Sequence, residues 1–165
     1  MKPLLVLLIT FGLLVLATYF VQGHADALLA GNVAMAIMLF FTGAGHFALT
    51  QGMVAMMPIW LPAKKALVYF TGIIELAAAV GLLVPALRIL IAWPLIAFFV
   101  LILPANIRAA LHHIDYQKGT IDGPGPRYLW FRIPLQLFFI AWVWYFSWAL
   151  PLWVSILHPF THPQP

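Results

Sequence analysis

The sequence predicts an all-α membrane protein, a polytopic bundle of five transmembrane helices in one compact unit. Of its 165 residues, 65% are hydrophobic and only 7% are charged, whereas a typical soluble domain is about half apolar and one quarter charged. A helix needs roughly 20 apolar residues to cross a bilayer. Five apolar stretches have about this length, so the spans account for most of the chain.

The five stretches lie between polar or Pro/Gly-containing breaks. The connections are expected at residues 23–31 and 52–65, at a tight turn around Pro85 and Ala86, and at residues 112–127, which are rich in Gly and Pro. The spans are expected at residues 3–22, 32–51, 66–84, 87–108 and 128–150.

This pattern divides the chain into three parts. Residues 1–22 are expected to form an N-terminal transmembrane anchor helix, and residues 32–150 a four-helix membrane domain. Residues 151–165 are expected to form a short segment on the outer surface, up to residue 157, followed by a poorly ordered Pro-rich tail.

The first stretch also has features of a cleavable secretory signal. Lys2 precedes an apolar run, and Ala25-Asp26-Ala27 fits an A-x-A cleavage pattern. The run is longer than the roughly 7–15 residues of a signal core, so we expect an uncleaved anchor. Cleavage would leave four helices in the same orientation.

The positive charges predict the orientation, because cytoplasmic loops of membrane proteins are enriched in Lys and Arg. With five crossings and a cytoplasmic N-terminus, only Arg88 lies outside and the C-terminus is external. We therefore expect a multi-pass protein of the bacterial cytoplasmic (inner) membrane. The basic residues expected on the cytoplasmic side are Lys2, Lys64, Lys65, Arg108, Lys118 and Arg127.

Composition excludes several functions. The chain has no cysteine, which excludes thiol catalysis, disulfide exchange, iron–sulfur ligation and thiolate-bound zinc. The net charge of +4 is attributed to topology signals, so we expect the lipid bilayer and not nucleic acid as partner. Redox chemistry would need a bound cofactor or another subunit.

Polar residues inside the apolar spans indicate where function lies, since a charge at the bilayer centre costs about 2.5 kcal/mol or more. Counting 1.5 Å per residue places them in the inner half of the membrane on four different helices. We expect a buried polar pocket there. The pocket residues are predicted to be His46, Glu75, Asn106, Arg132 and Gln136.

Two interpretations of this cluster stay open. Glu75 and Arg132 are expected to form an ion pair, because each would otherwise be an isolated charge in low dielectric. The small residues Gly43 and Gly45 leave space beside His46. The cluster is therefore either a ligand site or a polar clamp that fixes helix register.

Metal binding is the weaker prediction. His112 and Asp115 have the spacing of two metal ligands on one helix face, but no partner cluster is in view, so a solvated helix end is favoured. The Met residues between Met35 and Met57 have soft sulfur ligands for copper. Packing explains them more simply.

Five short motifs resemble one protein family. They are GAGHF at residues 43–47, MPIWLP at 57–62, FTGIIE at 70–75, PANI at 104–107 and RIPLQ at 132–136. In this order and spacing they resemble the DoxX-like family of small bacterial integral membrane proteins over residues 32–147. Positions typical of that family correspond to His46, Trp60, Pro62, Gly72, Glu75, Asn106, Arg132 and Gln136.

The resemblance implies a four-helix core and a link to redox metabolism. DoxX-like proteins are similar to subunits associated with thiosulfate:quinone oxidoreduction and with oxidative or thiol stress. The arrangement also resembles that of sterol isomerase and sigma-receptor relatives, whose buried carboxylates face a lipophilic cavity. The absence of cysteine here argues against thiol exchange.

The leading hypothesis is a site for a quinone or another lipophilic small molecule, in a membrane subunit of a redox complex. His46 and Arg132 would donate hydrogen bonds to a carbonyl oxygen, and Glu75 would orient His46 or accept a proton. The alternative is a non-catalytic membrane bundle that anchors or stabilises a partner protein.

Overall fold

Five long helices form the bundle, which confirms the predicted all-α membrane fold. The computed structural model describes residues 2–153, and these residues contain no β-strand, only an isolated bridge between Asp115 and Thr120. The five helical segments that are long and apolar enough to span a bilayer are Lys2–Gln22, Ala27–Ala48, Lys64–Leu83, Pro85–Leu111 and Pro126–Trp153.

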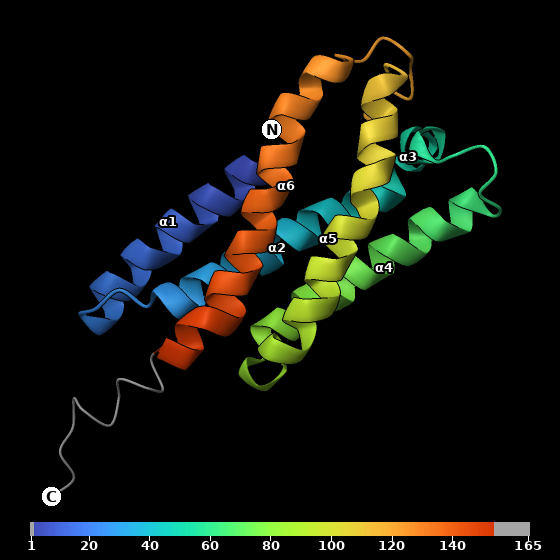
Figure 1. The fold of residues 1–165 in the computed structure, drawn as a ribbon. Coiled ribbons are helices and arrows are strands. Elements are labelled where there is room, and N and C mark those ends of the chain that lie inside the picture. The colour runs from blue at the N-terminus through green and yellow to red at the C-terminus, as the bar shows by residue number, and fades with distance from the viewer. Residues whose placement is uncertain (1, 154–165) are drawn as a thin grey trace, which may run out of the picture.

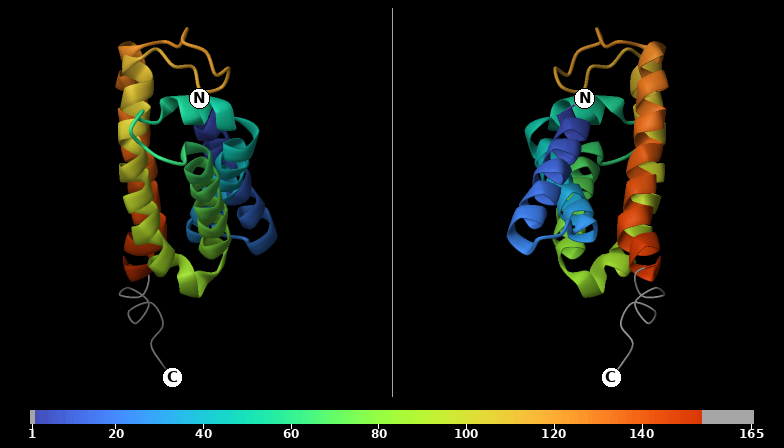
Figure 2. Two further views of the ribbon diagram at one scale, coloured as in Figure 1. Left: turned by 90° about the vertical axis from the view of Figure 1, so that its right-hand side faces the viewer. Right: turned by 90° about the vertical axis from the view of Figure 1, so that its left-hand side faces the viewer.

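The helices are arranged in two layers (Figures 1 and 2). Figure 2 shows α5 and α6 side by side along one side of the bundle, with α1, α2 and α4 along the other. In the second layer α2 packs against both α1 and α4. The bounds are α1 Lys2–Gln22, α2 Ala27–Ala48, α3 Thr50–Met56, α4 Lys64–Leu83, α5 Arg88–Leu111 and α6 Leu129–Trp144.

The second span begins earlier than predicted. It starts at Ala27 instead of residue 32, because the Asp26 carboxylate accepts a hydrogen bond from the Leu29 amide at 2.8 Å and caps the helix. The Asp26 amide in turn donates to Thr18 Oγ1 at 3.0 Å. This local hydrogen bonding shortens the connection between α1 and α2.

The second span also ends earlier than predicted, and the following connection is not a simple loop. Helix α2 ends at Ala48, and the short helix α3 occupies residues 50–56. Figure 2 shows α3 lying across the end of the bundle that carries the N-terminus. The Arg108 guanidinium on α5 donates to the carbonyls of Ala55 at 2.9 Å and Met57 at 2.7 Å, and so holds the C-terminal end of α3.

The last span is a continuous but irregular helix. After α6 the chain forms the π-helical segment η3 (Tyr145–Ala149), and residues 150–153 remain helical. The surface segment predicted at residues 151–157 is thus helical up to Trp153. Its remainder and the predicted tail lie outside the described residues.

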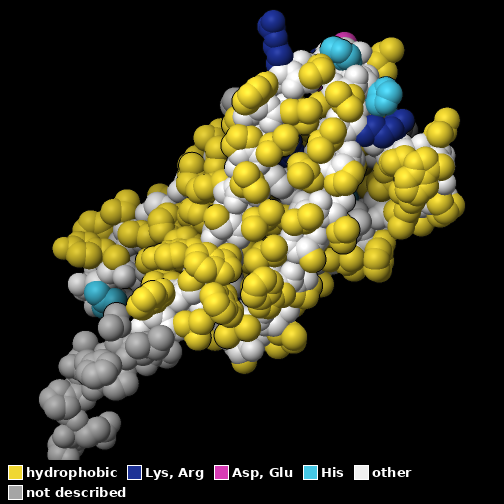
Figure 3. Space-filling view, viewed as in Figure 1, with side chains coloured by type: hydrophobic (Ala, Val, Ile, Leu, Met, Phe, Trp, Pro, Cys, Tyr) yellow, Lys and Arg dark blue, Asp and Glu magenta, His cyan; other side chains and the backbone are white. Residues whose placement is uncertain are grey.

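Charge separates the two ends of the bundle. In Figure 3 hydrophobic side chains cover its length, while Lys and Arg gather at the end that carries α3. Arg88, in contrast, begins α5 at the opposite end. The exposed apolar surface includes Phe20 on α1, Leu101 on α5 and Leu137 on α6, which suits helices that face lipid.

Candidate functional site

A cavity of about 750 Å³ lies within the bundle, and all five pocket residues predicted from the sequence line it. His46 comes from α2, Glu75 from α4, Asn106 from α5, and Arg132 and Gln136 from α6. The volume falls in the range of about 300–1,000 Å³ typical of small-molecule sites. The five residues thus line one cavity, whereas ligand binding by them stays a prediction.

Two glycines position the part of the site between α2 and α4. A Cβ atom on Gly43 would lie 3.3 Å from the Gly72 carbonyl oxygen, and one on Gly72 would lie 3.3 Å from the Gly43 carbonyl oxygen. Small residues allow helices to approach this closely in membranes. The crossing brings His46, three residues after Gly43, next to Thr71 and Glu75.

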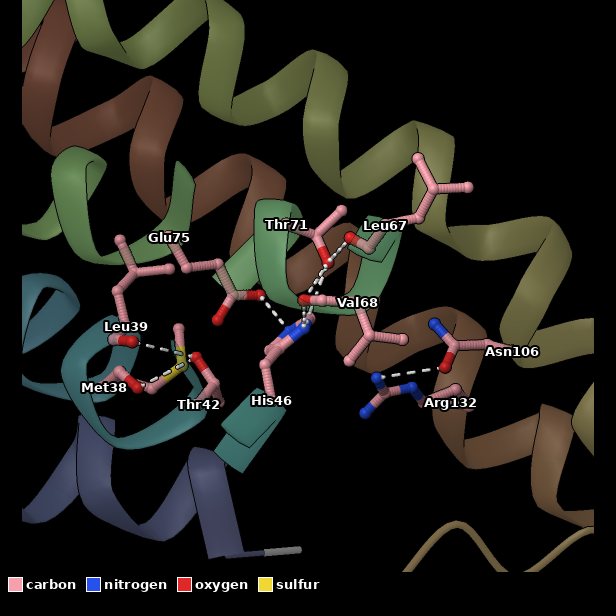
Figure 4. Close-up of polar contacts among 10 residues, drawn as sticks. All are labelled: Met38, Leu39, Thr42, His46, Leu67, Val68, Thr71, Glu75, Asn106 and Arg132. Carbon is pink, nitrogen blue, oxygen red and sulfur yellow. Dashed lines mark hydrogen bonds and ion pairs between the residues drawn. The ribbon is translucent and has the colours of Figure 1, made fainter. Parts of the chain in front are cut away.

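Both ring nitrogens of His46 have partners on α4 (Figure 4). Nδ1 lies 3.0 Å from the Val68 carbonyl oxygen and 3.1 Å from Thr71 Oγ1, and Nε2 lies 3.4 Å from Glu75 Oε1. A carbonyl can only accept, so Nδ1 carries a proton. The contact between Nε2 and Oε1 is attractive when a second proton lies between these two atoms.

The predicted ion pair between Glu75 and Arg132 is wrong. Glu75 contacts His46 instead, and an Arg132 Nη2 donates to Asn106 Oδ1 at 3.3 Å. The physical reason is helix adjacency: Glu75 projects from α4 toward α2, whereas Arg132 on α6 lies beside α5 (Figure 4).

Three buried polar atoms in these residues have no hydrogen-bond partner: Glu75 Oε2, Asn106 Nδ2 and Arg132 Nε. Glu75 is only 4% exposed and Asn106 only 9%. Buried polar groups in folded proteins almost always have partners, and an unpaired one is costly. Residues that line the cavity therefore carry one unpaired oxygen and two unpaired N–H groups.

Gln136 has a more structural position than the other four residues. It is 3% exposed, and its amide nitrogen donates to the Phe99 carbonyl oxygen on α5 at 2.6 Å. This bond joins α5 to α6 at the cavity wall. Gln136 thus fixes the helix that carries Arg132.

The rest of the cavity wall is largely apolar, with Lys2 and Lys118 as its basic side chains. Sulfur and aromatic side chains dominate the apolar part, which favours a lipophilic occupant. Lys2 and residues 116–118 line the end near the N-terminus. The apolar lining includes Met38, Phe41, Met53, Met56, Met57, Phe99, Ile102 and Phe139.

The weaker metal candidates do not gather into a cluster. Within residues 2–153 no group of three or more His, Asp or Glu side chains could hold a metal ion. The Asp115 carboxylate instead accepts from the Gln117 amide at 2.9 Å and lies 3.9 Å from Lys118 Nζ. It thereby orders the loop after α5.

Sequence reasoning missed a second polar cluster, centred on Asn32. Its amide nitrogen donates to the carbonyls of Leu28 at 2.9 Å and Phe146 at 3.0 Å, and its oxygen accepts from Ser147 Oγ at 2.8 Å. Asn32 had been placed at the edge of a span. The residue is 1% exposed. The sequence feature that could have indicated this cluster is a single amide side chain among Ala, Gly and Val residues.

Comparison with known proteins identifies a family. No curated protein and no solved structure matches the chain. A family model described as a domain of unknown function, DUF8561, matches residues 35–147. The matched region covers more than half of the chain and includes all five cavity residues named above. The chain therefore belongs to the DUF8561 family.

Proposed function

We propose that the cavity binds a lipophilic small molecule with a polar head group, a quinone being the leading example. The observation that carries the proposal is the set of unpaired atoms Glu75 Oε2, Asn106 Nδ2 and Arg132 Nε in residues lining one largely apolar cavity. A ligand that satisfies these atoms while its apolar part contacts Met and Phe side chains would remove their desolvation cost.

The polar chemistry suits an oxygen-bearing head group. The N–H groups of Asn106 and Arg132 would donate to a carbonyl oxygen, and Glu75 Oε2 would accept from a hydroxyl. A proton held between His46 and Glu75 would give the site a group for proton transfer. For a quinone, a bound cofactor or a partner redox subunit would supply the electrons, since this chain has no cysteine.

The resemblance to DoxX-like membrane proteins supports a redox setting for this binding. The five motifs that carry the resemblance include His46, Glu75, Asn106 and Arg132, the residues that contribute the polar cluster. We accordingly propose that the protein serves as a membrane subunit of an oxidoreductase system.

Ligand extraction tests the proposal directly. The protein is purified in mild detergent, extracted with organic solvent and analysed by mass spectrometry, and the stripped protein is titrated with a short-chain ubiquinone analogue. We expect one lipophile per chain and saturable binding that Asn106→Leu weakens at least tenfold. Gln22→Leu, the same loss of an amide at an exposed site outside the cavity, is the matched control. Absence of both extracted lipophile and saturable binding would refute the proposal.

A second candidate function is that of a non-catalytic bundle that anchors a partner protein. One observation favours it: only Leu7 and Thr18 of α1 are buried, so most of this apolar helix is free to contact lipid or another membrane helix. Crosslinking from the exposed face of α1 in native membranes would test it. A ligand-free protein with a stoichiometric α1 crosslink would favour this function over the first.

We further propose that the protein lies in the bacterial cytoplasmic membrane with its N-terminus in the cytoplasm. The concentration of basic side chains at the α3 end supports this orientation (Figure 3). Because the chain has no cysteine, single cysteines at Lys118 and at Ala86, in the opposite turn, give an unambiguous test. An impermeant maleimide should label Ala86→Cys but not Lys118→Cys in intact spheroplasts, and the reverse pattern would overturn the orientation.

A further inference from the structure

We propose that the head group bound in this cavity is an oxyanion, held by Arg132 and Asn106. The inference rests on the proposed function, and it narrows the ligand to acidic lipophiles. Two sources share this chemistry: the carboxylate of a fatty acid and the deprotonated hydroxyl of an acidic hydroxyquinone.

The charge balance of the cavity is the first argument. Its lining residues include three cations, Lys2, Lys118 and Arg132, but a single carboxylate, Glu75. Glu75 is engaged by His46. Among the lining residues the cations therefore outnumber the carboxylates, so the partners of each cation decide whether positive charge is left uncompensated.

The ion pairs leave two of these cations, Lys2 and Arg132, without a carboxylate partner among the described residues; Lys2 is exposed, whereas Arg132 is partly buried within an apolar span. Lys118 Nζ lies 3.9 Å from an Asp115 carboxylate oxygen and 3.7 Å from one of Asp122. Between residues 2 and 153 the ion pairs are these two and His46–Glu75, so no described carboxylate pairs with Arg132. An arginine within an apolar span is costly without a counter-ion or water, and a bound anion would supply the counter-ion.

Hydrogen-bond geometry gives the second argument. A guanidinium only donates, so Asn106 must turn its Oδ1 toward Arg132, and its NH₂ group is then left for another acceptor. Asn106 Nδ2 and Arg132 Nε are both buried and unpaired. Two neighbouring donors, one of them on a cation, match an oxyanion better than a neutral ketone because charge-assisted hydrogen bonds are stronger.

The apolar lining accounts for the other end of the ligand. Phe99, Ile102 and Phe139 line the same cavity as Arg132 and come from the same pair of helices, α5 and α6. Met38 and Phe41 on α2 line the opposite side. A flexible hydrocarbon chain can pack among such adaptable side chains.

Matched pairs of ligands test the inference in the full-length protein in nanodiscs. The first pair is oleate and methyl oleate, and the second is an alkylated 2-hydroxy-1,4-naphthoquinone and its counterpart without the hydroxyl. Each is titrated by quenching of intrinsic tryptophan fluorescence. The measured quantity is the affinity for the anionic ligand of a pair divided by the affinity for the neutral ligand. This ratio is compared between variants, because the partition of each ligand into lipid is the same for all variants and cancels.

We expect Arg132→Gln to lower this ratio at least tenfold, for one ligand pair or for both. Arg132→Lys, which keeps the charge, should retain most of the preference. Arg127→Gln, which removes an exposed cation outside the cavity, should leave the ratio unchanged. If Arg132→Gln does not fold, Arg132→Lys is compared with Asn106→Leu instead. The charge argument requires Arg132→Lys to retain more of the preference for the anionic ligand than Asn106→Leu, and equal losses of this preference would refute it.

The outcomes separate the two proposals. Equal ratios in the wild type and Arg132→Gln, with saturable binding in both, would overturn the oxyanion inference and leave the lipophile site intact. Failure of all four ligands to bind, together with the absence of an extracted lipophile and of ubiquinone-analogue binding, would refute the proposed function itself. A preference seen with only one pair would identify the fatty acid or the hydroxyquinone as the source of the oxyanion.

Discussion

Helix α2 carries a polar cluster toward each end, and the two differ in how completely their hydrogen bonds are formed. Around Asn32, the side-chain amide has partners for both its nitrogen and its oxygen, and Trp142 Nε1 donates to the Gly31 carbonyl at 3.0 Å. Around His46, three buried atoms of the neighbouring residues have none. Both clusters lie within apolar spans, where unpaired polar groups are costly.

Packing differs in the same sense. At the Asn32 end, a Cβ atom on Gly31 would lie 2.3 Å from the Phe146 ring, so α2 and the last span are in tight contact. At the His46 end, residues of α2 and α6 line the 750 Å³ cavity. The comparison teaches that complete pairing with dense packing marks a structural clamp, whereas incomplete pairing beside a cavity marks a candidate binding site.

The same substitution at both clusters gives the largest expected contrast. Asn32→Leu removes the bonds to Phe146 and Ser147 and strands both partners, so we expect a loss of about 2–3 kcal/mol in the free energy of unfolding. Asn106→Leu removes one 3.3 Å contact and one unpaired donor, so its loss should be below about 1 kcal/mol. Steric unfolding assays in bicelles measure both.

Ligand retention should show the opposite order. Folded Asn32→Leu protein is expected to keep its lipophile, because the clamp lies away from the cavity lining. Folded Asn106→Leu protein is expected to lose it. Similar stability losses in the two variants would contradict the distinction between clamp and site.

The α2–α4 crossing is predicted to be the next most sensitive feature. A Cβ on Gly72 would lie 2.7 Å from His46 Cβ, so Gly72→Ala must displace the imidazole from Val68 and Glu75. Overpacking of this kind costs about 1–3 kcal/mol, and ligand binding should fall with it. Gly12→Ala, where nothing lies within 4 Å, is the control and should change neither measurement.

The sequence was sufficient for the fold because spanning length and apolar composition are local properties. Five spans were predicted, and residues 2–153 contain five helical segments long and apolar enough to cross a membrane. The predicted helix boundaries were less accurate in two places. A short-range hydrogen bond to Asp26 sets the start of α2, and a hydrogen bond from the distant residue Arg108 holds the end of α3. Nothing in an apolar pattern specifies such contacts.

The residues that share the cavity were predictable from the sequence, but their pairing was not. Depth along each span grouped His46, Glu75, Asn106 and Arg132, and the structure brings them to one cavity. Which of them touch depends on which helices are neighbours, and this is set by the Gly43–Gly72 crossing. The sequence analysis expected Glu75 both to pair with Arg132 and to orient His46, and it could not tell that only the contact with His46 would form.

Double-mutant cycles can sharpen this point. Glu75 and His46 touch at 3.4 Å, so Glu75→Gln and His46→Gln should be coupled by about 0.5 kcal/mol or more. Glu75→Gln and Arg132→Gln should be additive to within about 0.3–0.5 kcal/mol. Unfolding free energies of the single and double variants give both values, and strong coupling in the second cycle would restore the ion pair that the structure lacks.

The smallest expected effect concerns α3, which bounds the cavity through Met53 and Met56. Arg108 donates to two carbonyls at the end of this helix, so Arg108→Gln should free it locally. Because the guanidinium is only partly buried and α3 is short, we expect a global loss of about 1 kcal/mol or less. The local change should be clearer: amide exchange in residues 50–57 should accelerate severalfold while exchange in α2 and α4 stays unchanged. Ligand dissociation should accelerate with it if α3 limits access to the cavity, and unchanged dissociation would mean that the ligand leaves between the long helices instead.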